Sequence, residues 1–300
     1  MQSNVDKMSN YRKNAKPHKD RVSEFFSRNT ITWEDIYQTD TSEAWKFDRY
    51  VMRKRKEAVL NIFQQHAANR SLRILDIGCG PGVFLAHLAK QGHLVLGIDR
   101  AEEMLREAKK KINSGYAVEA LCIRADIEEL PLANDSIDIT LCLGVLPYLG
   151  DDRRSLTEIS RVLRKDGIVI AVLPNMLRIN VLLDPFYYLC RVWQYFWHGM
   201  HRKMQGDCYA ADQEDIGRNR TFEIRRYLVW HLSTLFEQHG LEMFSARGID
   251  FGPLTFWRRE FLPVRLSMRL NDTLNRLSQK KGLSFMNAFA GQWVICLKKF

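Results

Sequence analysis

Short apolar runs alternate along the chain with segments whose apolar positions follow a helical spacing. The runs have the length and continuity of strands buried in a mostly parallel sheet. They are 72–77, 94–98, 118–123, 139–143, 168–173, 241–247 and 292–298. The helical segments between them are 83–90, 102–113, 155–163 and 221–238. This alternation predicts an α/β fold with helices on both faces of the sheet.

A glycine-rich turn joins the first strand to its helix. The sequence R-I-L-D-I-G-C-G-P-G places glycines at Gly78, Gly80 and Gly82. Without a Cβ atom, glycine lets the backbone turn at otherwise forbidden angles and approach a ligand near a helix N-terminus. About twenty residues later, Asp99 ends the second apolar run. This is the spacing expected of an acid that reaches ribose hydroxyls, so the pattern predicts a nucleoside-like ligand.

The spacing of the motif distinguishes between two kinds of cofactor. Asp76 stands two residues before the first glycine, and D-x-G-x-G-x-G lacks the third glycine of the dinucleotide pattern G-x-G-x-x-G. This form resembles the first motif of class I S-adenosylmethionine-dependent methyltransferases, of the type 11, ubiquinone–menaquinone methyltransferase-like group. The resemblance implies a Rossmann-like, seven-stranded, mostly parallel sheet with an antiparallel C-terminal strand. It also implies S-adenosylmethionine as cofactor and S-adenosylhomocysteine as its product.

Later residues extend the resemblance. Asp126 follows the third strand, where the family's acid bonds the adenine amine, and Ile127 is then expected against the ring. The resemblance implies a cofactor site of Asp76, Gly78, Cys79, Gly80, Gly82, Asp99, Arg100, Met104, Asp126, Ile127 and Leu143. A simpler alternative stays open for the carboxylates, which can also cap turns or helices through backbone amides.

The acceptor site is less defined. The segment after the fourth strand reads L-G-V-L-P-Y-L, where many members of the family carry histidines or other polar groups and this chain has Pro147 and Tyr148. Methyl transfer from a sulfonium needs alignment and exclusion of water, and it needs a base only when the acceptor proton is not already acidic. Weak candidates are Tyr148, His198, His201 and Asn175, and none is assigned as the base.

Several segments depart from the minimal α/β pattern. They predict a flexible basic tail at 1–24, a helical cap segment at 25–69, and a cofactor domain at 70–300 with insertions at 176–220 and 249–288. The first insertion is rich in aromatic residues and approaches the length of a bilayer-spanning helix. Because Asp184, Pro185 and Arg191 interrupt it, we do not expect it to span a bilayer. The resemblance implies a lid over the acceptor, and a satellite hydrophobic cluster is an equal alternative. A peripheral membrane contact through 179–203 is less favoured.

Composition narrows the class of protein. Six cysteines without C-x-x-C spacing indicate neither a zinc site nor a disulfide framework, and no other metal site is indicated. The first nineteen residues lack the apolar core of a signal peptide, so we expect a cytoplasmic protein, with the inner membrane face as the peripheral alternative. The net charge of +10 is compatible with nucleic acid, an anionic membrane or an acidic substrate, and it does not choose among them.

These observations favour O-methylation of a small, lipophilic or aromatic acceptor. An RNA methyltransferase is the alternative suggested by the basic balance, but no N-P-P-Y or D-P-P-Y tetrad follows the fourth strand, so nucleic acid is the less favoured partner. A non-catalytic protein that binds the cofactor or docks to a membrane is a further alternative. A nicotinamide oxidoreductase is the least favoured.

Overall fold

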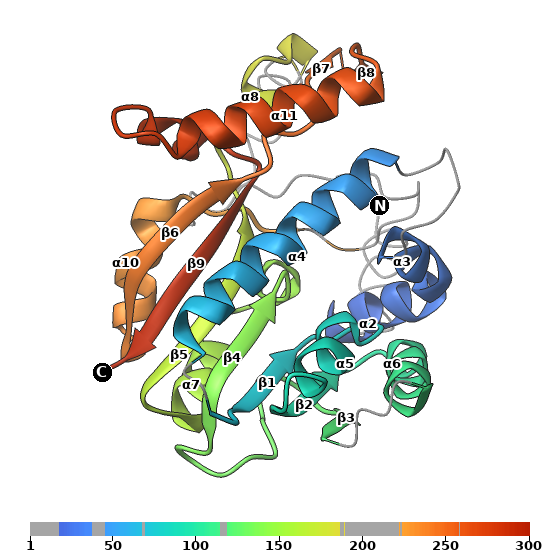
Figure 1. Cartoon of the computed structure of the whole chain (residues 1–300), viewed down its shortest axis with the longest axis vertical. Coiled ribbons are helices and arrows are strands. Elements are labelled where there is room, and N and C mark those ends of the chain that lie inside the picture. Colours follow the sequence, from blue (N-terminus) through green and yellow to red (C-terminus); the bar gives the residue numbers. More distant parts are fainter. Residues whose placement is uncertain are drawn as a thin grey trace, which may run out of the picture.

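A seven-stranded sheet runs through the centre of the computed structural model (Figure 1). The structure describes residues 18–37, 46–67, 70–114, 119–186, 189, 222, 224–257 and 259–300. The strands are β1 (Arg73–Ile77), β2 (Leu94–Asp99), β3 (Ala120–Arg124), β4 (Ile137–Leu143), β5 (Leu163–Pro174), β6 (Leu241–Ile249) and β9 (Gln292–Lys299). Their spatial order is β3-β2-β1-β4-β5-β9-β6. The predicted α/β fold with a seven-stranded sheet is confirmed.

Strand direction brings many strand ends to one edge of this sheet. β1 pairs in parallel with β2 and β4, and β4 pairs in parallel with β5. β9 is antiparallel to both of its neighbours, β5 and β6, which confirms the predicted antiparallel C-terminal strand. β6 therefore runs in the same direction as β1 and β4. The carboxyl ends of these strands meet at the edge where open α/β sheets bind ligands.

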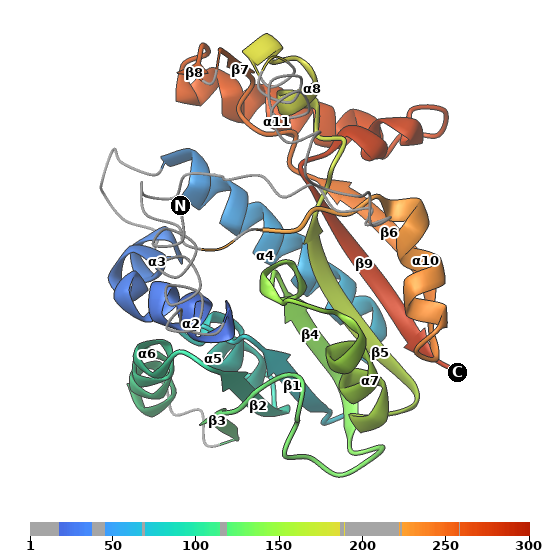
Figure 2. The ribbon, with the colours of Figure 1, turned by 180° about the vertical axis from the view of Figure 1, so that it is seen from behind.

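Helices cover both faces of the sheet (Figures 1 and 2). One face packs against α4 (Lys46–His66), α5 (Val83–Ala89) and α6 (Glu102–Ser114), and the other against α7 (Arg153–Val162) and α10 (Val229–Glu237). Side chains alternate between the faces, so Ile74 joins the first core whereas Leu75 and Ile77 join the second. By the same alternation, Asp76 points to the face covered by α4.

The N-terminal region corrects one prediction. The flexible tail expected up to residue 24 is wrong for residues 18–24, because they form the first turns of α2 (His18–Arg28). Aromatic contacts stabilise this helix: the ring centroids of Phe26 and Tyr148 lie 5.1 Å apart, and those of Phe25 and Phe222 lie 5.2 Å apart. Helix α3 (Thr30–Tyr37) follows. Residues 1–17 lie outside the described part of the chain.

A layer of short elements lies above the carboxyl edge of the sheet (Figures 1 and 2). It contains α8 (Ile179–Leu182), β7 (Thr255–Phe256), β8 (Arg259–Glu260), α11 (Val264–Ser278) and the 3-10 helix η2 (Ser284–Phe289). β7, β8 and α11 belong to the predicted insertion at 249–288, and η2 extends one residue beyond it. Most of the insertion at 176–220 lies outside the described residues. Among the described helices, none is both long enough and apolar enough to cross a bilayer.

Two element boundaries differ from the sequence prediction. The helix expected at 221–238 begins only at Val229, because the preceding backbone bonds to the end of β5. Tyr227 N donates to Pro174 O (3.0 Å), and Met176 N donates to Tyr227 O (3.1 Å). β5 begins at Leu163, five residues early, because Leu163 already pairs with Ile137 of β4.

Candidate active site

The glycine turn after β1 has the geometry that its sequence suggests. Gly78, Gly80 and Gly82 have φ angles of 64°, 52° and 74°, in the left-handed region that favours glycine. A Cβ atom at Gly78 would collide with Val145, and one at Gly82 would lie 2.9 Å from the Cβ of Ala108 on α6. A Cβ atom at Gly80 would have no neighbour within 4 Å, so Gly80 borders open space where a ligand can approach.

Asp99 fixes this turn from the end of β2. Its Oδ2 accepts a hydrogen bond from Gly80 N (3.0 Å), and its Oδ1 accepts one from Ala101 N (2.8 Å). Burial raises the pKa of Asp99, and the backbone N–H donors act in the opposite direction. The carboxylate therefore caps the start of α6, as the simpler alternative proposed, and it also positions the glycine turn. These two contacts leave acceptor capacity on both oxygens for ribose hydroxyls.

Asp76 is a buried carboxylate with an unsatisfied oxygen. Its side chain is 2% exposed, and among the described residues no group donates a hydrogen bond to its Oδ2. Burial and the neighbouring charge of Asp99 raise the pKa of Asp76 to about 8, although the Arg55 guanidinium opposes this shift. A buried carboxylate without a partner is costly, and a cationic or hydrogen-bond-donating ligand would remove that cost.

Asp126 is engaged by basic side chains. Its Oδ2 accepts hydrogen bonds from Lys19 Nζ (2.9 Å) and Arg100 Nη1 (2.5 Å), and its Oδ1 accepts one from Glu128 N (3.0 Å). Burial raises the pKa of Asp126, but the Glu128 amide and the two cations outweigh it, so the net shift is downward. Through Lys19, and through an ion pair between Arg100 and Asp20 (2.8 Å), this cluster fastens α2 beside the pocket.

These elements surround a cavity of about 730 Å³ at the carboxyl edge of the sheet. Nine of the eleven predicted cofactor residues line it: Asp76, Gly78, Cys79, Gly80, Asp99, Arg100, Met104, Ile127 and Leu143. The other two do not: Gly82 packs against α6, and Asp126 accepts hydrogen bonds from Lys19 and Arg100, which line the cavity. Their contact with a cofactor stays a prediction, as does that of the nine.

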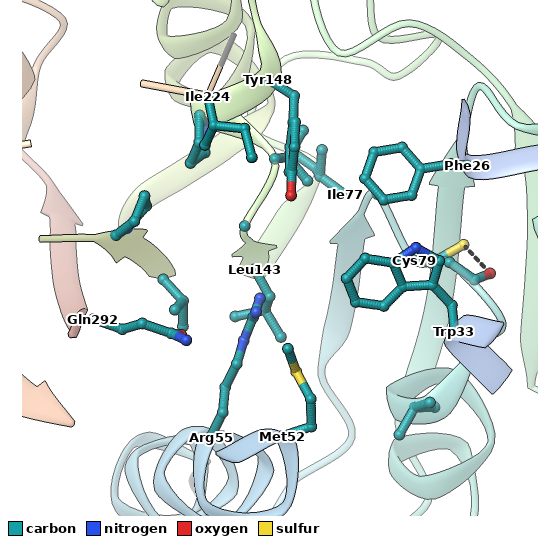
Figure 3. Close-up of a pocket in the computed structure, with 18 of the residues that line it drawn as sticks. Phe26, Trp33, Met52, Arg55, Ile77, Cys79, Leu143, Tyr148, Ile224 and Gln292 are labelled. Atoms are coloured by element: carbon teal, nitrogen blue, oxygen red, sulfur yellow. Dashed lines mark hydrogen bonds between the residues drawn. The ribbon is translucent and has the colours of Figure 1, made fainter. Parts of the chain in front are cut away.

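Aromatic side chains form one wall of this cavity (Figure 3). Phe26 of α2 contacts Tyr148 edge-on and lies 5.7 Å from Trp33 of α3, centroid to centroid. Tyr148 belongs to the 3-10 helix η1 (Leu146–Tyr148) after β4, and its hydroxyl oxygen points toward the centre of the cavity (Figure 3). Of the weak catalytic candidates, Tyr148 thus borders the cavity. His198 and His201 lie outside the described residues.

Asn175 has a structural contact instead. Its Nδ2 donates hydrogen bonds to Ala288 O and Ala290 O, both at 2.7 Å, and the residue is 1% exposed. These bonds tie the end of β5 to the segment before β9. Asn175 is therefore a poor candidate for a catalytic group.

The sequence prediction missed the residues on the opposite wall. Arg55 and Met52 project from α4 into the cavity, and Gln292 faces them from the start of β9 (Figure 3). Arg55 Nη2 lies only 3.0 Å from the position of a Cβ atom on Gly144. Asp250, directly after β6, also lines the cavity. It could have been found by the rule that singled out Asp99, an acid at a strand end.

Comparison with known proteins identifies the segment that builds this site. Residues 75–171 match the protein family described as "Methyltransferase domain". This segment is a methyltransferase domain. It contains the glycine turn, Asp99, Asp126 and η1, so the predicted resemblance to class I methyltransferases is confirmed.

Curated proteins named as methyltransferases resemble part of the chain. The chain is 33% identical over 115 residues to malonyl-[acyl-carrier protein] O-methyltransferase of Hamiltonella defensa, covering 38% of this chain and 43% of that protein. It is 32% identical over 114 residues to a ubiquinone biosynthesis O-methyltransferase of Neisseria meningitidis, covering 37% and 47%. The chain spans less than half the length of these curated relatives.

Solved structures share the fold over nearly the whole chain. Magnesium protoporphyrin IX methyltransferase from Synechocystis PCC 6803, with bound SAH, has a TM-score of 0.60 at 14% identity, covering 94% of this chain and 100% of that one. The [4+2]-cyclase SpnF has a TM-score of 0.57 at 14% identity, covering 94% and 96%. At these identities the likeness establishes the fold, and a cyclase among the neighbours shows that this fold carries more than one reaction.

Proposed function

We propose that this protein transfers the methyl group of S-adenosylmethionine to a small-molecule acceptor. The observation that carries the proposal is the buried Asp76 carboxylate beside the glycine turn of a methyltransferase domain, because its Oδ2 has no hydrogen-bond donor among the described residues. S-adenosylmethionine, when bound, supplies a methyl group on a sulfonium sulfur. Its amino-acid end carries an ammonium group, which could donate a hydrogen bond to Asp76 Oδ2.

The chain's own residues have defined tasks in this proposal. Asp99 accepts hydrogen bonds from the ribose hydroxyls. It already accepts one from the Gly80 amide, so the turn needs no rearrangement when the ligand binds. Ile127 and Leu143 line the cavity and would provide apolar surface for the adenosyl group. Helix α2 encloses the cavity through Phe26, which excludes water from the reacting atoms. The catalytic effect then comes mainly from alignment of the two reactants.

We further propose O-methylation of a lipophilic or aromatic acceptor. The wall formed by Phe26, Trp33 and Tyr148 supports an aromatic occupant, because ring pairs stack edge-on or offset at these separations. The names of the two curated relatives, both O-methyltransferases, support an oxygen acceptor. The cavity volume lies within the range of about 300–1,000 Å³ that is usual for small-molecule sites.

Thermal unfolding tests the proposed cofactor. At a ligand concentration a hundred times Kd, binding to the native state adds about 2.7 kcal/mol of stability. S-adenosylmethionine or S-adenosylhomocysteine should therefore raise Tm by several degrees, whereas NAD⁺ at the same concentration should leave Tm unchanged. Protection by NAD⁺ alone would replace the proposal with a nicotinamide-dependent function.

A peripheral membrane contact is a second proposal, supported by apolar side chains on the layer above the cavity. Phe256 and Trp257 of the β7–β8 hairpin are 56% and 52% exposed, and Leu183 and Leu189 are similarly exposed. Exposed aromatic residues in a chain of net charge +10 suit an anionic interface. Flotation with vesicles containing phosphatidylserine should recover the wild type, and Phe256→Ser with Trp257→Ser should reduce that recovery. Equal recovery of both would contradict it.

A further inference from the structure

Asp250 occupies a strand end at the ligand-binding edge of the sheet. It directly follows Ile249, the last residue of β6, and β6 runs in the same direction as β1 and β4. The carboxyl end of β6 therefore lies at the edge of the sheet that borders the cavity beside the glycine turn. Asp250 lines this cavity together with Arg178 and Gln292. It lies outside the segment 75–171 that matches the methyltransferase family.

The backbone and one oxygen of Asp250 are held by fixed partners. Asp250 has a φ of 62°, and its carbonyl accepts a hydrogen bond from Gly291 N. Its Oδ1 accepts hydrogen bonds from Gly252 N (2.9 Å) and Asn271 Nδ2 (2.8 Å). Asn271 is 1% exposed, and its own Oδ1 accepts a bond from Phe251 N (3.2 Å), which fixes the orientation of its amide. The carboxylate is thus positioned before any ligand binds.

The second oxygen of Asp250 remains available. Within the described part of the chain, no group donates a hydrogen bond to Oδ2, although Oδ1 has two donors. Asp250 is only partly buried. It lines the cavity, so its accessible surface faces the cavity. Residue 291 is a glycine, and a Cβ atom at this position would lie only 3.2 Å from Oδ2. Because glycine has no such atom, there is room beside this oxygen. Oδ2 can therefore accept a proton or a hydrogen bond from a bound molecule.

Burial and the surrounding charges determine the pKa of Asp250. Burial raises the pKa of Asp250 to about 6, with the negative charge of Asp48 on α4 adding to the rise and Arg178 opposing it. Arg55 of α4 and Glu260 of β8 also line the cavity. A carboxylate with a pKa near 6 is ionised at neutral pH and still basic enough to take a proton during a reaction.

We propose that Asp250 is the proton acceptor for an acceptor hydroxyl, an inference that rests on the proposed methyltransferase function. As the acceptor oxygen bonds to the methyl carbon, the carbon–sulfur bond breaks and its electron pair stays on sulfur. The hydroxyl proton passes to Oδ2 of Asp250. The products are a methyl ether, a neutral thioether and a protonated carboxyl group, which then releases its proton to water.

A purely structural role makes a different prediction. The two donors on Oδ1 would bond equally well to the amide oxygen of asparagine, so Asp250→Asn preserves the support of the loop. The variant lacks a group that can take the proton. A structural carboxylate would therefore tolerate this change, whereas a proton acceptor would not.

Phenols of graded acidity separate these roles. Transfer from methyl-labelled S-adenosylmethionine is measured with phenol, 4-chlorophenol and 4-nitrophenol as acceptors, for the wild type and Asp250→Asn. The variant should lose about 10²–10⁴-fold in rate with phenol and far less with 4-nitrophenol, because about half of the latter is already ionised near neutral pH. The wild-type rate with phenol should fall below about pH 6, and the variant should lack this dependence. Asp166→Asn, the same change at an exposed ion pair with Lys298, serves as the matched control.

Each other outcome has a defined meaning. Equal losses with all three phenols, or none, would overturn the role of Asp250. Absence of wild-type transfer to every phenol would also overturn it, while stabilisation by S-adenosylhomocysteine would leave the proposed function standing. If Asp250→Asn fails to fold, Asn271→Ala replaces it. This variant lacks the hydrogen bond that Asn271 donates to Asp250, so the midpoint of its pH–rate profile should lie at higher pH than that of the wild type. An unmoved midpoint would contradict the proposal.

Discussion

At the scale of single residues, the site gathers several carboxylates in a small volume. Asp76 lies one residue before the end of β1, Asp99 ends β2, and Asp250 follows β6. Each has a raised pKa with burial as its main cause. Backbone amides compensate Asp99 and Asp250, but Asp76 has an oxygen without a donor among the described residues. The binding of a cationic ligand would therefore relieve a cost that the free protein carries at Asp76.

This cost predicts a pH-dependent effect of Asp76→Asn on stability. The folded pKa of Asp76, about 8, lies above its ordinary value of 3.8, so the native state holds a proton that the unfolded state has lost. Its contribution to stability is full below about pH 4 and is lost as pH rises to about 8. Relative to the wild type, the free variant should gain stability between pH 5 and pH 9. Urea unfolding at both values measures this gain, and a constant difference would contradict the assigned pKa.

At the scale of elements, the glycine turn divides into a packed part and an open part. Gly82 abuts the backbone of α6, because a Cβ atom there would lie 3.0 Å from the Cα of Ala108, whereas Gly80 borders the cavity. Both have left-handed backbones, so replacement by alanine costs about 1–2 kcal/mol at either position. Only Gly82 adds a steric collision with a neighbouring helix.

The two alanine variants should therefore fail in different ways. Gly82→Ala should lower the free energy of unfolding by more than Gly80→Ala, by about 1–3 kcal/mol for the overpacking against α6. Gly80→Ala should stay folded but bind S-adenosylhomocysteine more weakly, because its methyl group enters the ligand's space. Denaturant unfolding and a binding titration of both variants test this. Equal stability together with equal affinity would contradict the division.

At the scale of the whole molecule, the sequence predicted what local patterns determine. The parallel strands, the glycine turn and Asp99 all follow from spacing within about thirty residues. Contacts between distant segments escaped prediction: residues 18–24 are helical because α2 packs through Phe26 on Tyr148, more than a hundred residues away. Asp250 likewise reaches the cavity only because β6 runs in the same direction as β1, although other strands lie between them.

Isothermal calorimetry of the purified protein with S-adenosylhomocysteine tests the central claim most directly. The wild type should show saturable binding at one site. Asp99→Ala, which removes hydrogen bonds from a charged acceptor worth about 1.5–3 kcal/mol each, should bind at least about tenfold more weakly. The absence of heat with the folded wild type, or identical isotherms for both proteins, would contradict the account.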